Sequence, residues 1–334
     1  MKTLHPQPPS SPISDPSSQL PWEDEGPLED RTEKLILHSK RTARQSKKLQ
    51  KKKRNTEPKG LLDLPYELVI EFLSYLRPSD VFRLSRVSKT LHGFITQETS
   101  TIVKHIICRR YQCLEKCFRY PVLLESMDPS VHSILQSEER QEIIGIHKKP
   151  YQHILPSDPN IVCTCLTCML RWNALCLVID FAHWQPNLEK GEPIPMIPRG
   201  TQPQWNTDLI VANAAIVSKA LRSPLWHALI LEVHLNSTVC SIRRHGENKG
   251  NKRRRFHMTK EDELSGTDYF LERSGPPSLD FPFHRDNYYM LEAYMPNRGW
   301  NREKETWMYV PADQHDRDVE ALLKWIERRR LQGS

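Results

Sequence analysis

Glycine is scarce in this sequence, with 12 residues among 334. The chain contains no Walker-type loop, no G-x-G-x-x-G, no G-x-S-x-G and no H-E-x-x-H. It therefore lacks the usual phosphate-binding loops, the nucleophile elbow of hydrolases and the zinc helix of metalloproteases. A nucleophile, a base and an orienting group cannot be assembled elsewhere from their spacing. We expect a protein without catalytic residues.

Signals for export and for membrane insertion are also missing. The opening stretch, MKTLHPQPPSSPISDPSSQLPWEDEG, has no apolar core of the kind that a secretory signal requires. No uncharged run approaches the length that spans a bilayer. We therefore expect a protein of the cytoplasm and/or nucleus, with no membrane partner. In that setting its eight irregularly spaced cysteines should be mostly reduced thiols.

The charge of the chain is concentrated in a few tracts. Lys and Arg exceed Asp and Glu by 48 to 41, a modest excess that does not by itself indicate a nucleic-acid partner. Residues 1–58 combine Pro and Ser clusters, an acidic patch and the basic run RTARQSKKLQKKKR at 41–54. Such a segment has too few large apolar groups to offset its ordering entropy, so we expect a disordered tail. Its basic run is either a nuclear-import signal or a solvated block of charge.

From residue 61 onward the hydrophobic pattern is mainly helical. Helices are predicted near 102–118, 131–147, 164–181 and 206–223, and SPLWHALILEVHL at 223–235 could be a helix or a strand. Residues 245–265 are predicted to be an exposed charged loop. NYYMLEAYM and EKETWMYVP, on either side of PNRGWNR, resemble the two strands of a hairpin, and a final helix should open at Asp313. The predicted fold class is mainly α with a small β-hairpin.

Residues 62–94, LDLPYELVIEFLSYLRPSDVFRLSRVSKTLHGF, carry more apolar surface than three short helices can cover. Pro65 is tolerated only at a helix start and should hold Leu64 extended, just outside the first turn. On a helical wheel the apolar residues of 68–76 sweep about 220°, roughly twice what a surface helix needs. Pro78 and Ser79 should end this helix and begin the next. The surplus must meet the rest of the chain or another protein.

This stretch resembles the F-box family, through LPYEL at 64–68, FLSYL at 72–76 and DVFRLSRVSK at 80–89. The resemblance implies a three-helix module at 59–98 that binds a Skp-type adaptor, itself held by a cullin in a ubiquitin ligase of the SCF type. Ser88 and Leu91 depart from the cysteine and tryptophan that the family often has there. The residues expected to contact the adaptor, or to support those contacts, are Leu64, Pro65, Leu68, Ile70, Leu73, Leu76, Val87, Lys89 and Leu91.

The remainder, residues 99–334, is expected to be an irregular helical domain that binds a target protein. Two of its segments, CTCLTCMLRWNALCLVIDFAHWQPNL and LEAYMPNRGWNREKETWMYVPADQHD, resemble F-box proteins of filamentous fungi. That resemblance supplies an architecture and no activity.

Cys163, Cys165 and Cys168 form C-x-C-x-x-C, three soft ligands that could share one Zn²⁺ if a fourth ligand came from elsewhere. Cys176 would lie about 12 Å further along a helix than Cys168, too far to share the ion. The remaining candidates for the fourth ligand are Cys108, Cys113, Cys117 and His153. Packing of the cysteines as small apolar side chains is the alternative, and we assign no metal and no cofactor from the sequence.

Other polar residues have structural interpretations that compete with a site. Trp172, Asp180, His183 and Trp184 stand at helical spacing, which is more typical of a core, and Asp180 could equally be a cap or a surface pair. His227 and His234 share one helical face and are expected to be satisfied or exposed to solvent. The basic stretch NKRRRF at 251–256 has a single aromatic residue, so nucleic-acid binding is not favoured.

The sequence therefore favours a non-catalytic substrate receptor of an SCF-type ligase. Two alternatives stay open. One is a nuclear nucleic-acid-associated protein that uses its basic tracts, and the other is a zinc-stabilised scaffold without a ligase role.

Overall fold

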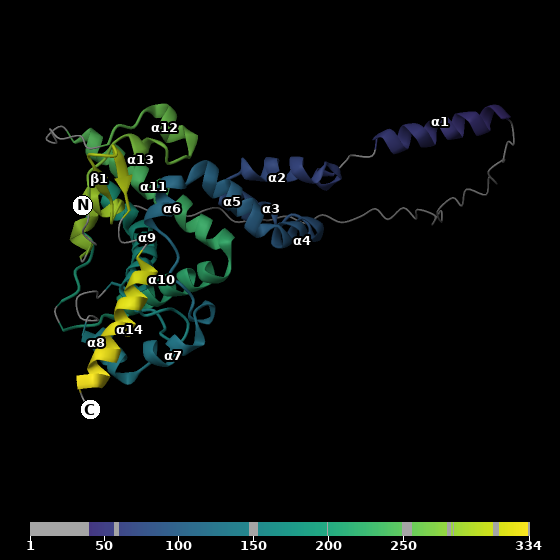
Figure 1. Ribbon diagram of the computed structural model, residues 1–334. Helices are drawn as coiled ribbons and strands as arrows, with labels where there is room; N and C mark the ends of the chain where they lie inside the picture. Colours follow the sequence, from purple (N-terminus) through teal and green to yellow (C-terminus); the bar gives the residue numbers. More distant parts are fainter. Residues whose placement is uncertain are drawn as a thin grey trace, which may run out of the picture. The chain divides into compact units, whose positions relative to one another are not determined.

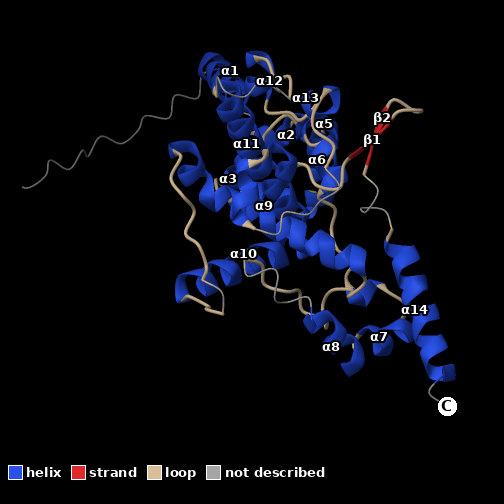
Figure 2. Cartoon of the chain, turned by 90° about the vertical axis from the view of Figure 1, so that its left-hand side faces the viewer, coloured by secondary structure: helices blue, strands red, loops and turns tan. Residues whose placement is uncertain are grey.

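The computed structural model describes residues 40–56, 60–146, 153–198, 200–248, 256–278, 282, 284–309 and 314–332. These residues are mostly helical and include one antiparallel hairpin (Figure 2). The chain divides into two compact units, residues 1–59 and residues 60–334. The predicted fold class, mainly α with a small hairpin, is confirmed.

The described part of the first unit is one exposed helix, α1 (Lys40–Thr56). It lies where the composition predicts disorder. The difference has a local cause, because the Lys, Arg, Gln and Leu residues of this run are strong helix formers. Residues 1–39 and 57–59 of the predicted tail lie outside the described residues.

The second unit begins with short helices separated by proline and serine. They are η1 (Leu61–Asp63), α2 (Tyr66–Ser74), α3 (Pro78–Leu84) and α4 (Lys89–Gln97), followed by α5 (Thr99–Arg110) (Figure 1). Leu64 is extended, with φ −73° and ψ 154°, and α2 starts directly after Pro65, as predicted. Pro78 occupies the first turn of α3, where its missing N–H costs nothing.

The helix predicted at 102–118 is in fact two helices. It breaks at Tyr111 between α5 and α6 (Gln112–Cys117). The cause is a distant carboxylate: Asp268 accepts the backbone N–H groups of Cys113 and Leu114, both at 2.8 Å. Those donors are thereby satisfied at the start of a new helix. The helix predicted at 131–147 is likewise split, into α7 (Pro129–Leu135) and α8 (Glu138–Ile146).

Three long helices form the core of the C-terminal region. They are α9 (Leu166–Lys190), α10 (Gln204–Arg222) and α11 (Pro224–Glu247), and they pack on one another. The structure resolves the ambiguity at 223–235 in favour of a helix. Gly191 ends α9 with a φ of 69°, a left-handed conformation that glycine adopts without a Cβ clash.

The segments that follow α11 differ most from the prediction. Part of the expected loop at 245–265 is helical, since α11 continues to Glu247 and α12 (Lys260–Ser265) carries a capping box on Thr259. Residues 249–255, and with them most of NKRRRF, lie outside the described residues. After α13 (Phe270–Arg273), the expected first strand at 287–295 is replaced by the 3₁₀ helices η3 (Arg285–Tyr289) and η4 (Leu291–Tyr294).

The hairpin consists of β1 (Gly299–Asn301) and β2 (Thr306–Met308), with Trp300 opposite Trp307. The chain then forms α14 (His315–Gln332), which lies beside α7 and α8 in both views (Figures 1 and 2). Asp313, predicted to open this helix, lies outside the described residues. Within the described ranges, no helix combines the length and the apolar character needed to cross a membrane.

Candidate functional site

Helix α2 is apolar on two opposite faces, and the described part of the chain covers only one of them. Val69, Ile70 and Leu73 are 1%, 6% and 0% exposed and belong to the main hydrophobic core. They lie on the side of α2 that packs on α5. This face accounts for part of the wide apolar sweep that the sequence shows on a helical wheel.

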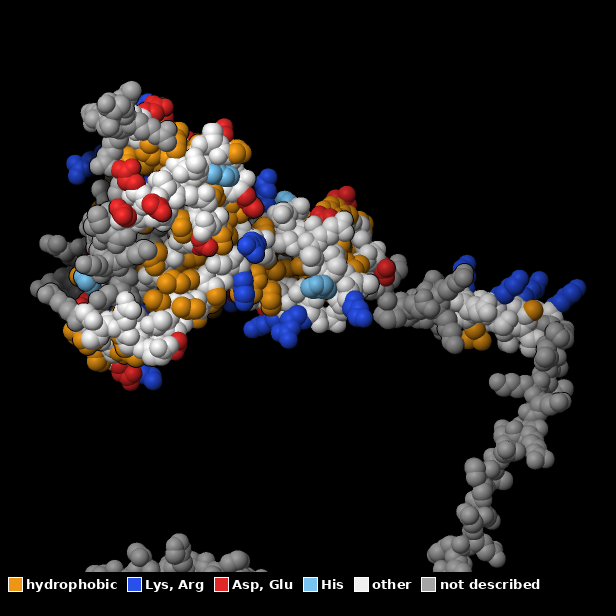
Figure 3. Space-filling model, turned by 90° about the horizontal axis from the view of Figure 1, so that it is seen from below, with side chains coloured by type: hydrophobic (Ala, Val, Ile, Leu, Met, Phe, Trp, Pro, Cys, Tyr) orange, Lys and Arg blue, Asp and Glu red, His pale blue; other side chains and the backbone are white. Residues whose placement is uncertain are grey.

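The other face remains open to solvent. Leu64, Leu68, Phe72 and Tyr75 are 45%, 49%, 45% and 52% exposed. At about 100° per residue Leu68, Phe72 and Tyr75 fall within a narrow arc, nearly opposite the buried face, and the extended Leu64 stands just before the helix. We call them the apolar stripe. Figure 3 shows apolar side chains at several places on one face of the molecule. An uncovered stripe of large apolar side chains is typical of a surface that binds another protein.

The predicted adaptor-binding residues fall into three groups by exposure. Leu64, Pro65, Leu68, Val87 and Lys89 are exposed, Leu76 and Leu91 are half-buried, and Ile70 and Leu73 are buried. The buried pair can support the surface and cannot touch a partner directly. Phe72 and Tyr75 were not among the predicted residues, although the helical wheel placed them in the apolar surplus.

Two local interactions hold α2 and α4 together. The Tyr66 hydroxyl donates a hydrogen bond of 2.6 Å to Glu98, which raises the pKa of Tyr66, and its ring meets Phe94 edge-on at 6.1 Å.

Ser88 caps α4, because its hydroxyl accepts the Leu91 N–H at 3.2 Å. A serine at this position therefore has a structural role of its own.

The helices of the stripe are fixed to the C-terminal region. Glu232 of α11 accepts hydrogen bonds from Ser79 at the start of α3, and Phe82 of α3 packs edge-on against Trp226 of α11 at 5.7 Å. Arg110 of α5 donates to the backbone carbonyls of Tyr75 and Gly266, at 2.5 and 3.2 Å. The exposed face of α2 is thus held in a defined orientation on the rest of the second unit.

Residues 61–102 match the family model of the F-box domain. This segment is an F-box domain. The match includes η1, α2, α3, α4 and the first residues of α5. Comparison with curated proteins finds no match, and neither does comparison with solved structures. F-box domains bind Skp-type adaptors in SCF ubiquitin ligases, and the proteins that carry them generally serve as non-catalytic substrate receptors.

Asp180 lies in a buried ionic network. The sequence had suggested a cap or a surface pair, and Asp180 is neither. Its carboxylate accepts two hydrogen bonds from Arg285, at 2.9 and 3.0 Å, and one from the Tyr288 hydroxyl at 2.8 Å. The guanidinium also lies 5.0 Å from the ring of Trp184. His183, in contrast, is exposed. Asn213 of α10 donates a further hydrogen bond to Asp180 at 3.4 Å, so the fully buried carboxylate joins α9 to α10 and η3 and has a structural role.

His227 and His234 are buried, and each is oriented by a backbone carbonyl. The Nε2 atom of His227 lies 2.9 Å from the Phe118 carbonyl, and that of His234 lies 2.7 Å from the Tyr294 carbonyl. Because a carbonyl only accepts, Nε2 carries the proton in each ring. Burial lowers the pKa of both side chains to about 4, so both are neutral at pH 7. The sequence predicts satisfied or solvent-exposed histidines; both rings are buried, with Nε2 bonded and Nδ1 without a hydrogen-bond partner among the described residues.

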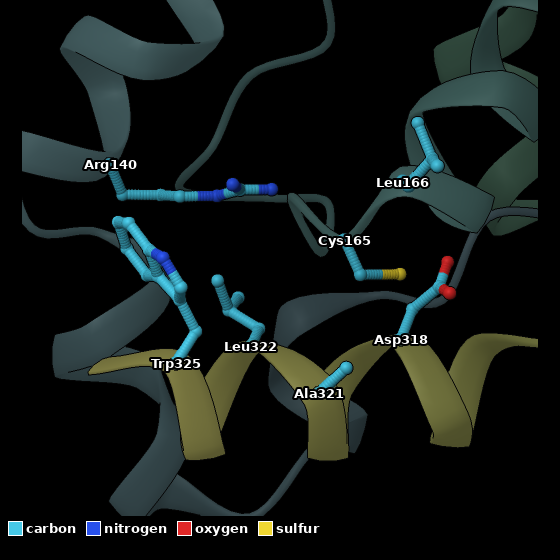
Figure 4. A pocket seen from close by; sticks show the side chains of 7 residues that line it. All are labelled: Arg140, Cys165, Leu166, Asp318, Ala321, Leu322 and Trp325. Atoms are coloured by element: carbon cyan, nitrogen blue, oxygen red, sulfur yellow. The ribbon is translucent and has the colours of Figure 1, made fainter. Parts of the chain in front are cut away.

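One cluster of metal-ligating side chains occurs in the described residues. It consists of Cys163, Cys165, Cys168 and His315, and a pocket of about 350 Å³ lies beside it. Figure 4 shows Arg140 extending over Trp325 and Leu322 of α14, with Cys165 and Asp318 on the other side of this pocket. The fourth member is His315, which was not among the candidates that the sequence suggested. Only its place at the opening of the last helix could have signalled it.

Proposed function

We propose that this protein is the substrate-recognition subunit of an SCF-type ubiquitin ligase. The F-box helices would bind a Skp-type adaptor, itself bound to a cullin, and the C-terminal region would bind the protein to be ubiquitinated. The observation that carries the proposal is the apolar stripe, which lies on an F-box domain and which the described residues leave open.

The adaptor contacts are assigned to the exposed residues. Leu64 and Leu68 would bury their remaining exposed surface in the interface, each contributing about 0.7–1.5 kcal/mol, because about half of each side chain is already covered. Pro65 fixes the position of Leu64 by starting α2. Val87 is 72% exposed at the other end of the module and would extend the apolar contact. Lys89 adds a positive charge at the edge of this apolar contact.

The contribution of the protein to the reaction would be proximity. Holding a target lysine near a charged ubiquitin-conjugating enzyme raises the effective concentration of the lysine, and no side chain of this chain has to do chemistry. In the described residues α3 is hydrogen-bonded to α11 and packed on it. This contact would hold the F-box in one orientation relative to the C-terminal region. We place this activity in the cytoplasm and/or nucleus, where the basic helix α1 would act as an import signal.

The test is capture of a purified Skp-type adaptor by the full chain. The variant Leu64→Glu/Leu68→Glu places two charges in the apolar stripe without touching the core. We expect it to weaken adaptor binding more than about 100-fold, the equivalent of two lost apolar anchors. Met196→Glu is the control, because Met196 is 83% exposed in the segment between α9 and α10, outside the F-box.

Binding by the charged variant with the affinity of the unaltered protein would refute the proposal. A dependence on salt distinguishes the rival function. Apolar capture of the adaptor should change little with ionic strength, whereas binding of DNA or RNA through basic tracts should fall steeply as salt rises.

A further inference from the structure

Four soft or borderline ligand atoms converge at the start of α9. The Sγ atoms of Cys163, Cys165 and Cys168 and a ring nitrogen of His315 all lie within 4.8 Å of one another. The Nδ1 atom of His315 is 3.3 Å from the sulfur of Cys165 and 3.3 Å from that of Cys168. All three cysteines are buried, and the His315 side chain is only 15% exposed.

This arrangement has the composition and size of a tetrahedral zinc site. Zinc binds thiolate sulfur at about 2.3 Å and imidazole nitrogen at about 2.0–2.1 Å, so the edges of its tetrahedron measure about 3.5–3.8 Å. The two distances of 3.3 Å from His315 to sulfur are close to those edges, and no pair of ligand atoms is more than 4.8 Å apart. Three thiolates with one imidazole form a closed structural set, which leaves no position for a substrate.

Backbone groups and a nearby cation suit the charge of such a site. The N–H groups of Val122, Cys165 and Cys168 point at the sulfurs of Cys168, Cys163 and Cys165, at 3.3, 3.4 and 3.4 Å. Donors of this kind orient and stabilise thiolate ligands. Zn²⁺ with three thiolates carries a net negative charge. The guanidinium of Arg140 donates to the carbonyl of Thr164 at 2.5 Å, and Thr164 stands between Cys163 and Cys165 in the sequence. The positive charge of Arg140 therefore offsets the negative charge of the site.

The position of His315 is fixed by its own helix. Three residues further along α14, Asp318 accepts the backbone N–H and the hydroxyl of Thr167, at 2.7 and 2.6 Å. It thereby caps the first turn of α9. Leu322 then packs into a small hydrophobic cluster whose other buried members include the three cysteines. His315, Asp318 and Leu322 share one face of α14, so the contact that buries the leucine also presents the histidine to the thiols.

We propose that Cys163, Cys165, Cys168 and His315 bind one zinc ion that fastens α14 to the start of α9. The second hydrophobic cluster is small, and three of its seven buried residues are the ligands themselves. Such a core cannot hold a terminal helix strongly on its own. Zinc supplies the missing stabilisation and also fixes Asp318 and Cys165 as walls of the adjoining pocket.

The test measures zinc in the full chain, purified under reducing conditions without added metal. We expect about one zinc per chain by elemental analysis. His315→Ala and Cys165→Ser should each weaken zinc affinity more than about 100-fold. This exceeds the loss of affinity that is typical when a residue that only hydrogen-bonds to a ligand is replaced. His315→Cys supplies a fourth thiolate and should retain the metal. His257→Ala and Cys108→Ser are the controls, because both side chains are exposed and lie outside the cluster.

Two further readouts separate this proposal from the proposed function and from misfolding. Chelation should increase amide hydrogen exchange in α7 and α14 and leave α2–α4 protected, so adaptor capture should survive in His315→Ala. Cobalt added to the apoprotein should give the visible absorption of a tetrahedral thiolate site. A chain that neither carries zinc nor takes it up would overturn the proposal. So would a disulfide between two of the three cysteines in protein kept under reducing conditions.

Discussion

Glu232 accepts two hydrogen bonds from Ser79, one from its backbone N–H at 2.8 Å and one from its hydroxyl at 2.7 Å. The two residues are 153 positions apart, one in the F-box and one in α11 of the C-terminal region. The carboxylate lies at the N-terminus of α3, where a negative charge is favourable. The pair therefore fixes the orientation of the adaptor-binding surface relative to the region that we assign to the target.

The first prediction concerns this connection. Glu232→Ala should lower the free energy of unfolding by about 1–3 kcal/mol, since it leaves a half-buried serine and the end of α3 without their acceptor. It should also increase hydrogen exchange at the start of α3. Glu247→Ala, an exposed position on the same helix, should change stability by less than about 0.5 kcal/mol. Equal effects of the two variants would show that the contact does not hold the F-box in place.

The second prediction separates the two faces of α2. Leu73 is fully buried, so Leu73→Ala should cost about 2–5 kcal/mol of stability. Leu68 is 49% exposed, so Leu68→Ala should leave stability within about 0.5 kcal/mol and weaken adaptor binding at least about tenfold. Urea unfolding and titration calorimetry measure the two quantities on the same samples. A large loss of stability in Leu68→Ala would mean that the exposed stripe belongs to the core.

The third prediction concerns the Asp180–Arg285 pair. Asp180→Asn leaves a buried guanidinium without its counter-charge, and it should destabilise the protein by about 3–5 kcal/mol. Replacing both partners by apolar residues, as in Asp180→Leu/Arg285→Met, should cost less than the sum of the losses in Asp180→Leu and in Arg285→Met. Urea unfolding of the four proteins in this cycle measures the coupling. Additive losses would show that the two side chains do not depend on each other.

Local rules explain why part of this fold could be predicted. Pro65 and Pro78 restrict the backbone directly, so the extended Leu64 and the starts of α2 and α3 followed from the sequence. The surplus of apolar residues on α2 was also visible. The sequence did not show which side of α2 is covered, because that depends on packing against α5, which is a tertiary contact.

The errors have a common cause in contacts between distant residues. Helical periodicity continues through Tyr111, yet Asp268, more than 150 residues away, starts a new helix there. Alternation at 287–295 resembles a strand, yet Arg285 and Tyr288 turn toward Asp180 and the backbone winds into 3₁₀ turns. His315 is 147 residues from Cys168, so no spacing rule links them.

The fourth prediction is a loss of stability in mild acid that depends on His227 and His234. Both have a pKa of about 4 in the folded protein because burial disfavours the charged ring, whereas an unfolded histidine has a pKa near 6.5. Between these values the unfolded chain binds more protons. The contribution of the two neutral histidines to the free energy of unfolding is therefore fully present above about pH 6.5. It is lost as the pH falls toward 4, by about 1.4 kcal/mol per pH unit for each histidine.

Urea unfolding at about pH 7.5 and pH 5.5 measures this loss. His227→Gln/His234→Gln keeps a donor for each backbone carbonyl but cannot be protonated, so it should reduce the difference between the two pH values by about 2–3 kcal/mol. Any other group that is protonated in this range also contributes to the loss. It affects both proteins equally, so the difference between them isolates the two buried rings. His257→Gln, at an exposed position, should behave like the unaltered chain, and an unchanged pH dependence in the double variant would contradict the neutral, buried state of these histidines.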